Sequence, residues 1–239
     1  MAHISRRELK TDEFHDTLEH GWEVLTEHKR TIWQVSVVAV VVAAAIFGWR
    51  YYTGRQNAEA SAALAQAMQA YSAPVQQAGQ PPVPGQTSYP TSEAKYQAAQ
   101  TAMAGVAAHF GGTRYGQMAA YYEAVSLDHL KHYQEAANKL VPLSKSGDAE
   151  FRPLAKFELA NVYDRMGKPA LALPLLEELL AKPSVFVPKP VVLLALGDHY
   201  LAQKQSQQAA KYYKQIQAEY PNTGLADQAS RRLEMLGTS

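Results

Sequence analysis

Hydrophobic and polar residues follow different patterns in three parts of the chain. In an N-terminal tail, residues 1–30, apolar side chains recur at helical spacing among acidic ones and predict an amphipathic helix. Residues 31–49 form one run of nineteen residues without a charge. From residue 93 onward, small and large hydrophobic positions recur every 36 or 37 residues. The patterns predict an apolar span followed by a repeat domain.

The uncharged run has the length and the flanks of a transmembrane helix. A helix of nineteen residues, at about 1.5 Å per residue, nearly crosses a hydrocarbon core of about 30 Å. Basic residues flank it, and Trp33 and Trp49 lie where aromatic side chains favour the water–lipid boundary. A buried core helix rarely carries charges and aromatics at both ends, and a signal peptide would not follow so long a tail. We therefore predict a transmembrane helix over residues 31–52.

Charges around the span favour one orientation. Five basic residues precede it and two follow it: Arg6, Arg7, Lys10, Lys29 and Arg30, then Arg50 and Arg55. Short cytoplasmic segments carry an excess of Lys and Arg, so we expect the tail in the cytoplasm and the remainder outside. The polar face of the tail helix is acidic, which argues against an anionic lipid surface. The tail helix therefore either binds a protein partner or packs on a neighbouring element of the same chain.

Two segments lie between the span and the repeats. Residues 53–71 are rich in alanine and predict a juxtamembrane helix that continues from the span. Residues 72–92 contain five prolines together with Gln and Gly, and predict a flexible loop. The repeat domain then occupies residues 93–239, with a C-terminal capping helix over residues 225–236.

Small residues share a register throughout the repeat domain. One series is spaced by 37, 36 and 37 residues, and a second series keeps the same step: Ala99, Ala136, Ala172 and Ala209, then Ala124, Ala160 and Gly197. A small residue belongs where two helices cross closely, and large residues fill the gap to the next hairpin. The turn at residues 110–113 also aligns with residues 220–223, which lie 110 positions later. This register predicts an all-α solenoid of helical hairpins.

Two stretches carry the signature of a known repeat. Leu159-Ala160-x-x-Tyr163-x-x-x-Gly167-x-x-x-x-Ala172 resembles the tetratricopeptide repeat, and Leu196-Gly197-x-x-Tyr200 resembles it as well. The first full unit departs from the motif, with Glu123 where leucine is usual. The opening unit is split, because the proline-rich loop separates its first helix, residues 56–71, from its second, residues 93–110.

The whole layout is similar to membrane-anchored tetratricopeptide proteins related to the ancillary subunit of the Sec translocon. The residues that carry this resemblance are Phe-Gly-Trp-Arg-Tyr-Tyr at 47–52, the alanine-rich helix after them, and Arg114-Tyr115-Gly116 at the start of a repeat. The resemblance implies a single-pass protein of the bacterial inner membrane. It also implies that the repeat domain lies in the periplasm and contacts the translocon and periplasmic chaperones.

Composition excludes several functions. Lys and Arg number 23 against 22 Asp and Glu, so no net field attracts nucleic acid, and the absence of cysteine rules out thiolate chemistry and disulfides. No glycine-rich phosphate loop or serine elbow occurs. His129 and His132 have helical spacing, but Asp128 faces elsewhere and no third ligand accompanies them. We therefore expect no enzyme, no metal or cofactor, and no small-molecule substrate.

These observations predict a membrane-anchored scaffold that binds polypeptides; the alternative is a structural accessory subunit of a larger membrane complex. In stacked hairpins the first helix of each unit lines a concave groove. Counted from the small residue of each unit, the groove positions are Tyr121, Val125, Asp128, His129, Phe157, Asn161, Asp164, Arg165, Leu194, Asp198 and Leu201. Alternatively, a neighbouring helix, residues 56–71 or 225–236, covers Phe157, Tyr121 and Leu194.

Overall fold

The computed structural model describes residues 29–76, 87–146 and 148–237, so the predicted tail helix and the middle of the proline-rich loop lie outside the described residues. Within these ranges the secondary structure is helical and no strand occurs, apart from an isolated bridge between Val75 and Tyr89. The predicted all-α class is confirmed. The helices are α2 (Lys29–Ser72), α3 (Ser92–Phe110), α4 (Arg114–His129), α5 (Tyr133–Ser144), α6 (Phe151–Arg165), α7 (Pro169–Ala181), α8 (Lys189–Ala202), α9 (Ser206–Glu219) and α10 (Gly224–Met235).

The chain divides into two compact units, residues 1–55 and 56–239. The first unit contains a helical segment that is long and apolar enough to cross a membrane. Its large side chains are exposed, among them Trp33 at 68% and Phe47 at 75%. A core helix would bury such residues, so the exposure argues against the alternative of a buried core helix.

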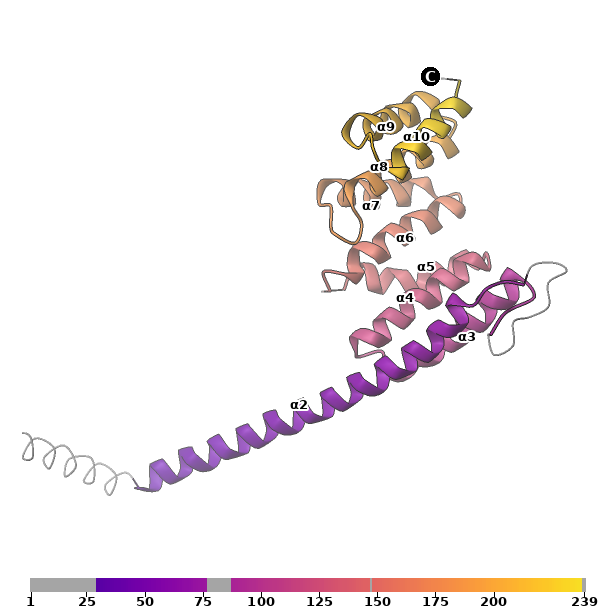
Figure 1. The fold of residues 1–239 in the computed structure, drawn as a ribbon. Coiled ribbons are helices and arrows are strands. Elements are labelled where there is room, and N and C mark those ends of the chain that lie inside the picture. Colours follow the sequence, from indigo (N-terminus) through magenta and orange to yellow (C-terminus); the bar gives the residue numbers. More distant parts are fainter. Residues whose placement is uncertain (1–28, 77–86, 147, 238–239) are drawn as a thin grey trace, which may run out of the picture. The chain divides into compact units, whose positions relative to one another are not determined.

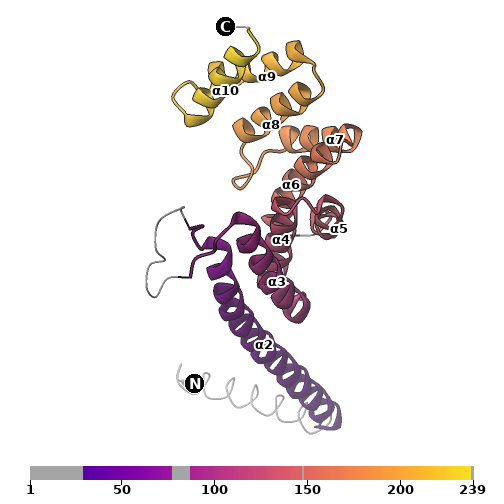
Figure 2. The ribbon, with the colours of Figure 1, turned by 90° about the vertical axis from the view of Figure 1, so that its right-hand side faces the viewer.

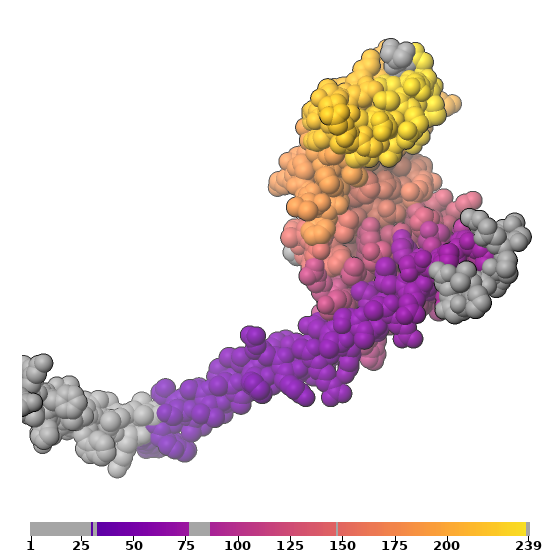
Figure 3. Space-filling model, in the orientation of Figure 1, coloured from indigo at the N-terminus to yellow at the C-terminus, as the bar shows by residue number. Residues whose placement is uncertain are grey.

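The second unit is a stack of helical hairpins (Figures 1 and 2). The final part of α2 packs with α3 and α4, and the pairs α4–α5, α6–α7 and α8–α9 follow in chain order. Each first helix also neighbours the next one, so α4 lies beside α6, α6 beside α8, and α8 beside α10. In the space-filling view the C-terminal helices lie directly against the layer of α7 and α8 (Figure 3).

The small residues of the predicted register lie where the helices cross. Ala124, Ala160 and Ala172 are completely buried. At Gly197 a Cβ atom would lie 2.3 Å from the ring of Tyr213, so only glycine allows α8 and α9 to approach this closely. The register therefore sets the spacing of the helices, and large residues such as Leu196 fill the space between hairpins.

The turns inside the three full hairpins share one geometry. Lys131, Gly167 and Lys204 have positive φ angles of 64°, 68° and 61°, respectively. In each turn the next backbone N–H donates to the carbonyl five residues earlier, as from His132 to Leu127 at 2.8 Å. This is the left-handed termination in which glycine is most favourable. Two of the three hairpins use lysine there instead.

The aligned turns at residues 110–113 and 220–223 also match in structure. Thr113 and Thr223 are the N-caps of α4 and α10, and their hydroxyls accept hydrogen bonds from Gly116 N and Ala226 N. Each hydroxyl also donates to the carbonyl three residues earlier, at 2.8 Å. The C-terminal helix α10 thus begins in the same way as the first helix of a repeat.

Glu123, which replaces the usual leucine of the motif, is buried on α4. It forms an ion pair with Lys139 on α5, with 2.8 Å between Nζ and Oε1. The pair compensates the buried carboxylate and joins the two helices of the hairpin. This contact explains how the first full unit keeps the repeat fold without leucine.

Candidate functional site

Carboxylates on three successive first helices each pair with a basic side chain on the next first helix. The pairs are Asp128–Arg165 between α4 and α6, Asp164–His199 between α6 and α8, and Asp198–Arg232 between α8 and α10. In the second and third pairs the closest nitrogen and oxygen atoms are 2.8 and 2.9 Å apart. We call the surface that α4, α6, α8 and α10 form around these pairs the ladder face.

The ladder face is hollowed between α6 and α8. The hollow has a volume of about 340 Å³. Its lining residues are Phe157, Asn161, Asp164, Arg165, Val191, Leu194, Ala195, Asp198, His199 and Ala202. Apolar side chains thus lie beside an amide, two carboxylates and a guanidinium. This combination can bury a side chain of a polypeptide and hydrogen-bond to its backbone.

Six of the eleven predicted groove residues lie together in this hollow. They are Phe157, Asn161, Asp164, Arg165, Leu194 and Asp198. They come from the second and third full units, where the repeat register places equivalent positions of α6 and α8 on one face. Asp128 adjoins the group, because it contacts Arg165 at the edge of the hollow.

The other predicted positions lie outside the hollow and are partly covered by neighbouring helices. Tyr121 is half-buried beside Tyr122, whose ring contacts Tyr71 at the end of α2 with 4.9 Å between centroids. His129 stacks on Tyr96 of α3 at 3.9 Å. Val125 is half-buried on α4, and Leu201 packs against the C-terminal cluster that includes α10. Leu201 thus contacts the C-terminal helices and Tyr121 lies near the end of α2, whereas His129 remains exposed.

The carboxylates of Asp128, which is buried, and Glu158, which is partly buried, share one guanidinium at the edge of the hollow. Nη1 of Arg165 contacts Asp128 and also lies 3.8 Å from Glu158 Oε1. Burial raises the pKa of Glu158, and the nearby Asp128 raises it further, whereas Arg165 and a hydrogen bond from Asn161 oppose the rise in pKa. Oδ1 of Asp128 is buried without a hydrogen-bond donor. The local charge is therefore incompletely compensated.

The pair between Asp198 and Arg232 is supported by a hydrogen bond from the hydroxyl of Tyr213. Tyr213 donates a hydrogen bond to Asp198 Oδ1 at 2.7 Å, and Arg232 contacts both oxygens of the same carboxylate. Burial, followed by this hydrogen bond, raises the pKa of Tyr213 above its ordinary value. Tyr213 thus stays protonated and holds Asp198 at the rim of the hollow.

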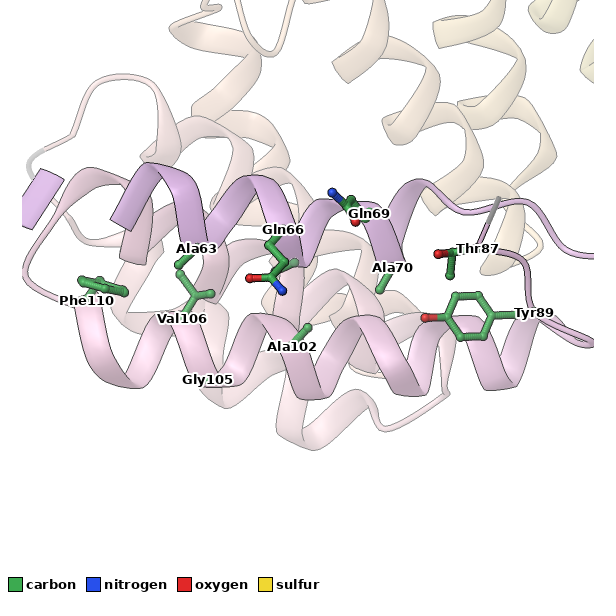
Figure 4. Close-up of a pocket in the computed structure, with 11 residues that line it drawn as sticks. Ala63, Gln66, Gln69, Ala70, Thr87, Tyr89, Ala102, Gly105, Val106 and Phe110 are labelled. Carbon is green, nitrogen blue, oxygen red and sulfur yellow. The ribbon is translucent and has the colours of Figure 1, made fainter. Parts of the chain in front are cut away.

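A second cavity, of about 510 Å³, lies between α2 and α3 (Figure 4). Small residues make up much of its lining, among them Ala63, Ala70, Ala102 and Gly105, and none of its lining residues carries a charge. Such a surface allows close packing of helices but provides no electrostatic selectivity. The hollow of the ladder face is therefore the stronger candidate site.

Comparison with known proteins agrees with this architecture. Residues 26–235 match the model of the tetratricopeptide repeat-like domain. The chain belongs to this family. A solved structure from Podospora anserina, described as a kinesin light chain with nearly identical TPR-like repeats, is 21% identical, with a TM-score of 0.45 over 60% of this chain and 85% of that one. No curated protein matches the chain.

The tetratricopeptide repeat-like fold typically serves as a scaffold for proteins and not as a catalyst. In the part of this family member that the structure describes, no three His, Asp or Glu side chains are grouped to hold a metal ion. His129 in particular stacks on an aromatic ring. Burial lowers the pKa of His129; the charge of Asp128 opposes this shift, and the smaller effects of Arg165 and Lys95 add to it.

Four residues of the tetratricopeptide ladder face escaped the sequence analysis: Glu158, His199, Tyr213 and Arg232. Glu158 resembles ordinary polar surface in the sequence, because its burial depends on α4 and the end of α2. A signal for the pairs was nevertheless present. Arg165 follows Asp128 by 37 residues, one repeat length, which places the two side chains on adjacent first helices.

Proposed function

We propose that this protein is a membrane-anchored scaffold whose ladder face binds polypeptide segments. The observation that supports the proposal is the hollow between α6 and α8, where apolar residues such as Phe157 and Leu194 adjoin Asn161. An extended segment can bury a side chain between the apolar residues, and the amide can hydrogen-bond to its backbone. The apolar part of α2 provides the anchor, since it is long enough to span a bilayer and fully exposed.

The proposed location is the bacterial inner membrane, with the tail in the cytoplasm and the repeat domain in the periplasm. The excess of basic residues before the span supports this orientation. The similarity of the layout to proteins related to the ancillary Sec translocon subunit makes protein secretion or periplasmic folding the proposed process. Translocon subunits and periplasmic chaperones are then the proposed partners.

The test blocks the hollow without removing a native contact. Ala202 is the exposed last residue of α8 and lines the hollow, so Ala202→Trp places a large side chain over it. The matched control is Ala181→Trp, at the exposed last residue of α7, outside the hollow. Each full-length variant is cross-linked in native membranes, and its attached polypeptides are identified after affinity purification.

We expect the polypeptides captured by the wild-type chain and by Ala181→Trp to be lost or strongly reduced with Ala202→Trp. The same variants are compared by thermal unfolding to show that both remain folded. If all three proteins capture the same polypeptides in equal amounts, the ladder face is not the binding surface.

The exposed apolar segment of α2 supports a second candidate, a structural accessory subunit of a larger membrane complex. In that case the span itself would be the main attachment, and its Val, Ile and Phe side chains would pack against other helices. A complex of fixed stoichiometry that survives detergent and is unaffected by Ala202→Trp would favour this candidate over the scaffold.

A further inference from the structure

Acidic groups outnumber permanent cations on the ladder face. Four carboxylates lie there, and two arginines are placed to balance them: Asp128, Glu158, Asp164 and Asp198, against Arg165 and Arg232. Each arginine is already engaged, since Arg165 contacts two of the carboxylates and Arg232 binds a third through two nitrogens. Asp164 is left with His199 as its partner.

Asp164 pairs with a histidine, His199, which is not a permanently charged side chain. Its Nδ1 lies 2.8 and 2.9 Å from the two oxygens of Asp164 and donates to that carboxylate. Its Nε2 lies 2.7 Å from the amide nitrogen of Gln203, which can only donate. The partner of Asp164 is thus an imidazole that is shared with Gln203, and not a lysine or an arginine.

A carboxylate oxygen without a hydrogen-bond donor also favours a cationic ligand. Asp128 is 7% exposed, and its Oδ1 has no donor, although its other oxygen contacts Arg165. Buried acceptors without donors are costly. Asp198 is more accessible, with 39% of its side chain exposed at the rim of the hollow. The ladder face thus combines a buried carboxylate oxygen that lacks a donor with an accessible carboxylate.

The apolar residues of the hollow suit the stem of a long basic side chain. Val191, Leu194 and Ala195 lie on α8 in the same hollow as Asp164 and Asp198. Lys and Arg bury their aliphatic stems along apolar surface while the charged end seeks a polar partner. An acidic segment would instead meet these two carboxylates, and Arg165 is occupied by its own acidic partners.

We infer that the ladder face selects polypeptide segments bearing lysine or arginine, whose stem lies in the hollow and whose charge meets Asp164 and Asp198. This inference rests on the proposed function, because it names the class of segment that the scaffold binds. Charge complementarity of this kind also speeds association and makes it sensitive to salt.

The first experiment measures which peptides the full-length, detergent-solubilised chain binds. The probe is an immobilised array of short random peptides, incubated with the labelled wild-type protein at low and at high salt. We expect the bound peptides to be enriched in Lys and Arg and their signal to fall as salt rises. Bound peptides that are mainly acidic or uncharged would overturn this inference while leaving the proposed function intact. An array without specific binding would overturn both.

The second experiment changes the charge at one exposed position of the hollow. Ala202→Lys adds a competing cation, and Ala202→Glu adds a carboxylate. Both side chains keep the Cβ atom of the alanine, so neither substitution removes a native contact. For the strongest basic peptide of the array, we expect Ala202→Lys to weaken binding about tenfold and Ala202→Glu to leave it unchanged or tighten it. Ala181→Lys, on α7, should bind like the wild type.

Isosteric removal of charge completes the test. The double variant Asp164→Asn and Asp198→Asn keeps the size of both side chains and should lose most binding of the basic peptide, with a much smaller loss for uncharged peptides. Thermal unfolding checks that the variant is folded. Equal binding by wild-type, Ala202→Lys and Ala202→Glu proteins would overturn the inference.

Discussion

Gly197 marks the closest approach between α8 and α9. A Cβ atom there would lie 2.3 Å from Tyr213, a fully buried ring whose hydroxyl is tied to Asp198. Gly197→Ala should therefore lower the free energy of unfolding by about 1–3 kcal/mol through overpacking. Urea denaturation followed by circular dichroism measures the change.

Gly105 provides the control for this substitution. It is exposed on α3, and a Cβ atom added there would meet no other atom within 4 Å. Gly105→Ala should raise the free energy of unfolding by about 0.5–1 kcal/mol, because alanine favours helix more than glycine does. Equal effects of the two substitutions would show that α8 and α9 do not meet at Gly197.

Glu158 makes stability depend on pH. Its pKa is raised, chiefly by burial and then by Asp128, with Tyr71 and Tyr121 close by and Arg165 opposing. The native state then binds the proton more tightly than the unfolded state, so this contribution to stability is present at acid pH and is lost as pH rises through the raised pKa. Glu158→Gln should raise the melting temperature at neutral pH and leave it nearly unchanged at acid pH.

Glu219 should behave in the opposite way and serves as the control. A hydrogen bond from Lys189 is the main cause that lowers its pKa, followed by one from Gln215. Its stabilising contribution is therefore present at neutral pH and is lost as pH falls through the lowered pKa. Glu219→Gln should lower the melting temperature at neutral pH. Identical pH profiles for both variants would contradict the assignment of Glu158.

At the scale of elements, the turns inside the hairpins offer a direct comparison. Lys204 has a φ of 61° at the position where Gly167 has 68°. L-residues in this conformation cost about 1 kcal/mol or more relative to glycine. Lys204→Gly should therefore raise the free energy of unfolding by up to about 1 kcal/mol, and Gly167→Ala should lower it by about the same amount. Denaturant unfolding curves of both variants, measured together, would contradict this geometry if the signs were reversed.

The hairpins could be predicted because packing repeats with the sequence. Ala124, Ala160 and Gly197 must each admit a neighbouring helix, and this need leaves a periodic trace in the residue types. The acid–base pairs between the first helices of successive hairpins are harder to predict from the sequence. A contact such as that of Asp164 with His199 depends on which side chain of each first helix reaches the next first helix. The repeat length predicts that the helices are neighbours, but it does not predict which of their polar residues form a pair.

At the scale of the whole molecule, the groove positions predicted from the repeat register agree with the structure in the middle of the array but not at its ends. The register brought Phe157, Asn161 and Leu194 together, because the units on both sides of them are equivalent. The register also predicted Tyr121 and Leu201 as groove positions, but the structure places them outside the hollow, near the end of α2 and the C-terminal helices. Periodicity describes the middle of a solenoid, whereas its ends depend on elements that do not repeat.

Membrane topology is the prediction that concerns the entire chain. With the basic tail in the cytoplasm, protease added to spheroplasts should degrade the repeat domain and leave an anchored N-terminal fragment. Detection with antibodies against each end of the chain measures the outcome. Lysed spheroplasts provide the positive control, and a cytoplasmic marker protein shows that the membrane is intact. Protection of the repeat domain until lysis would reverse the orientation.

The three acid–base pairs of the ladder face also bear on how the array comes apart. A solenoid behaves as a row of units coupled to their nearest neighbours, so its unfolding is cooperative only while the couplings outweigh the differences between units. Each pair adds to one such coupling, and both residues of the pair between α6 and α8 line the hollow. If the coupling between α6 and α8 were weakened, the hairpins on its two sides would unfold separately. A polypeptide bound in the hollow would contact both sides. A ligand in the hollow would then couple the two hairpins and restore cooperative unfolding across them.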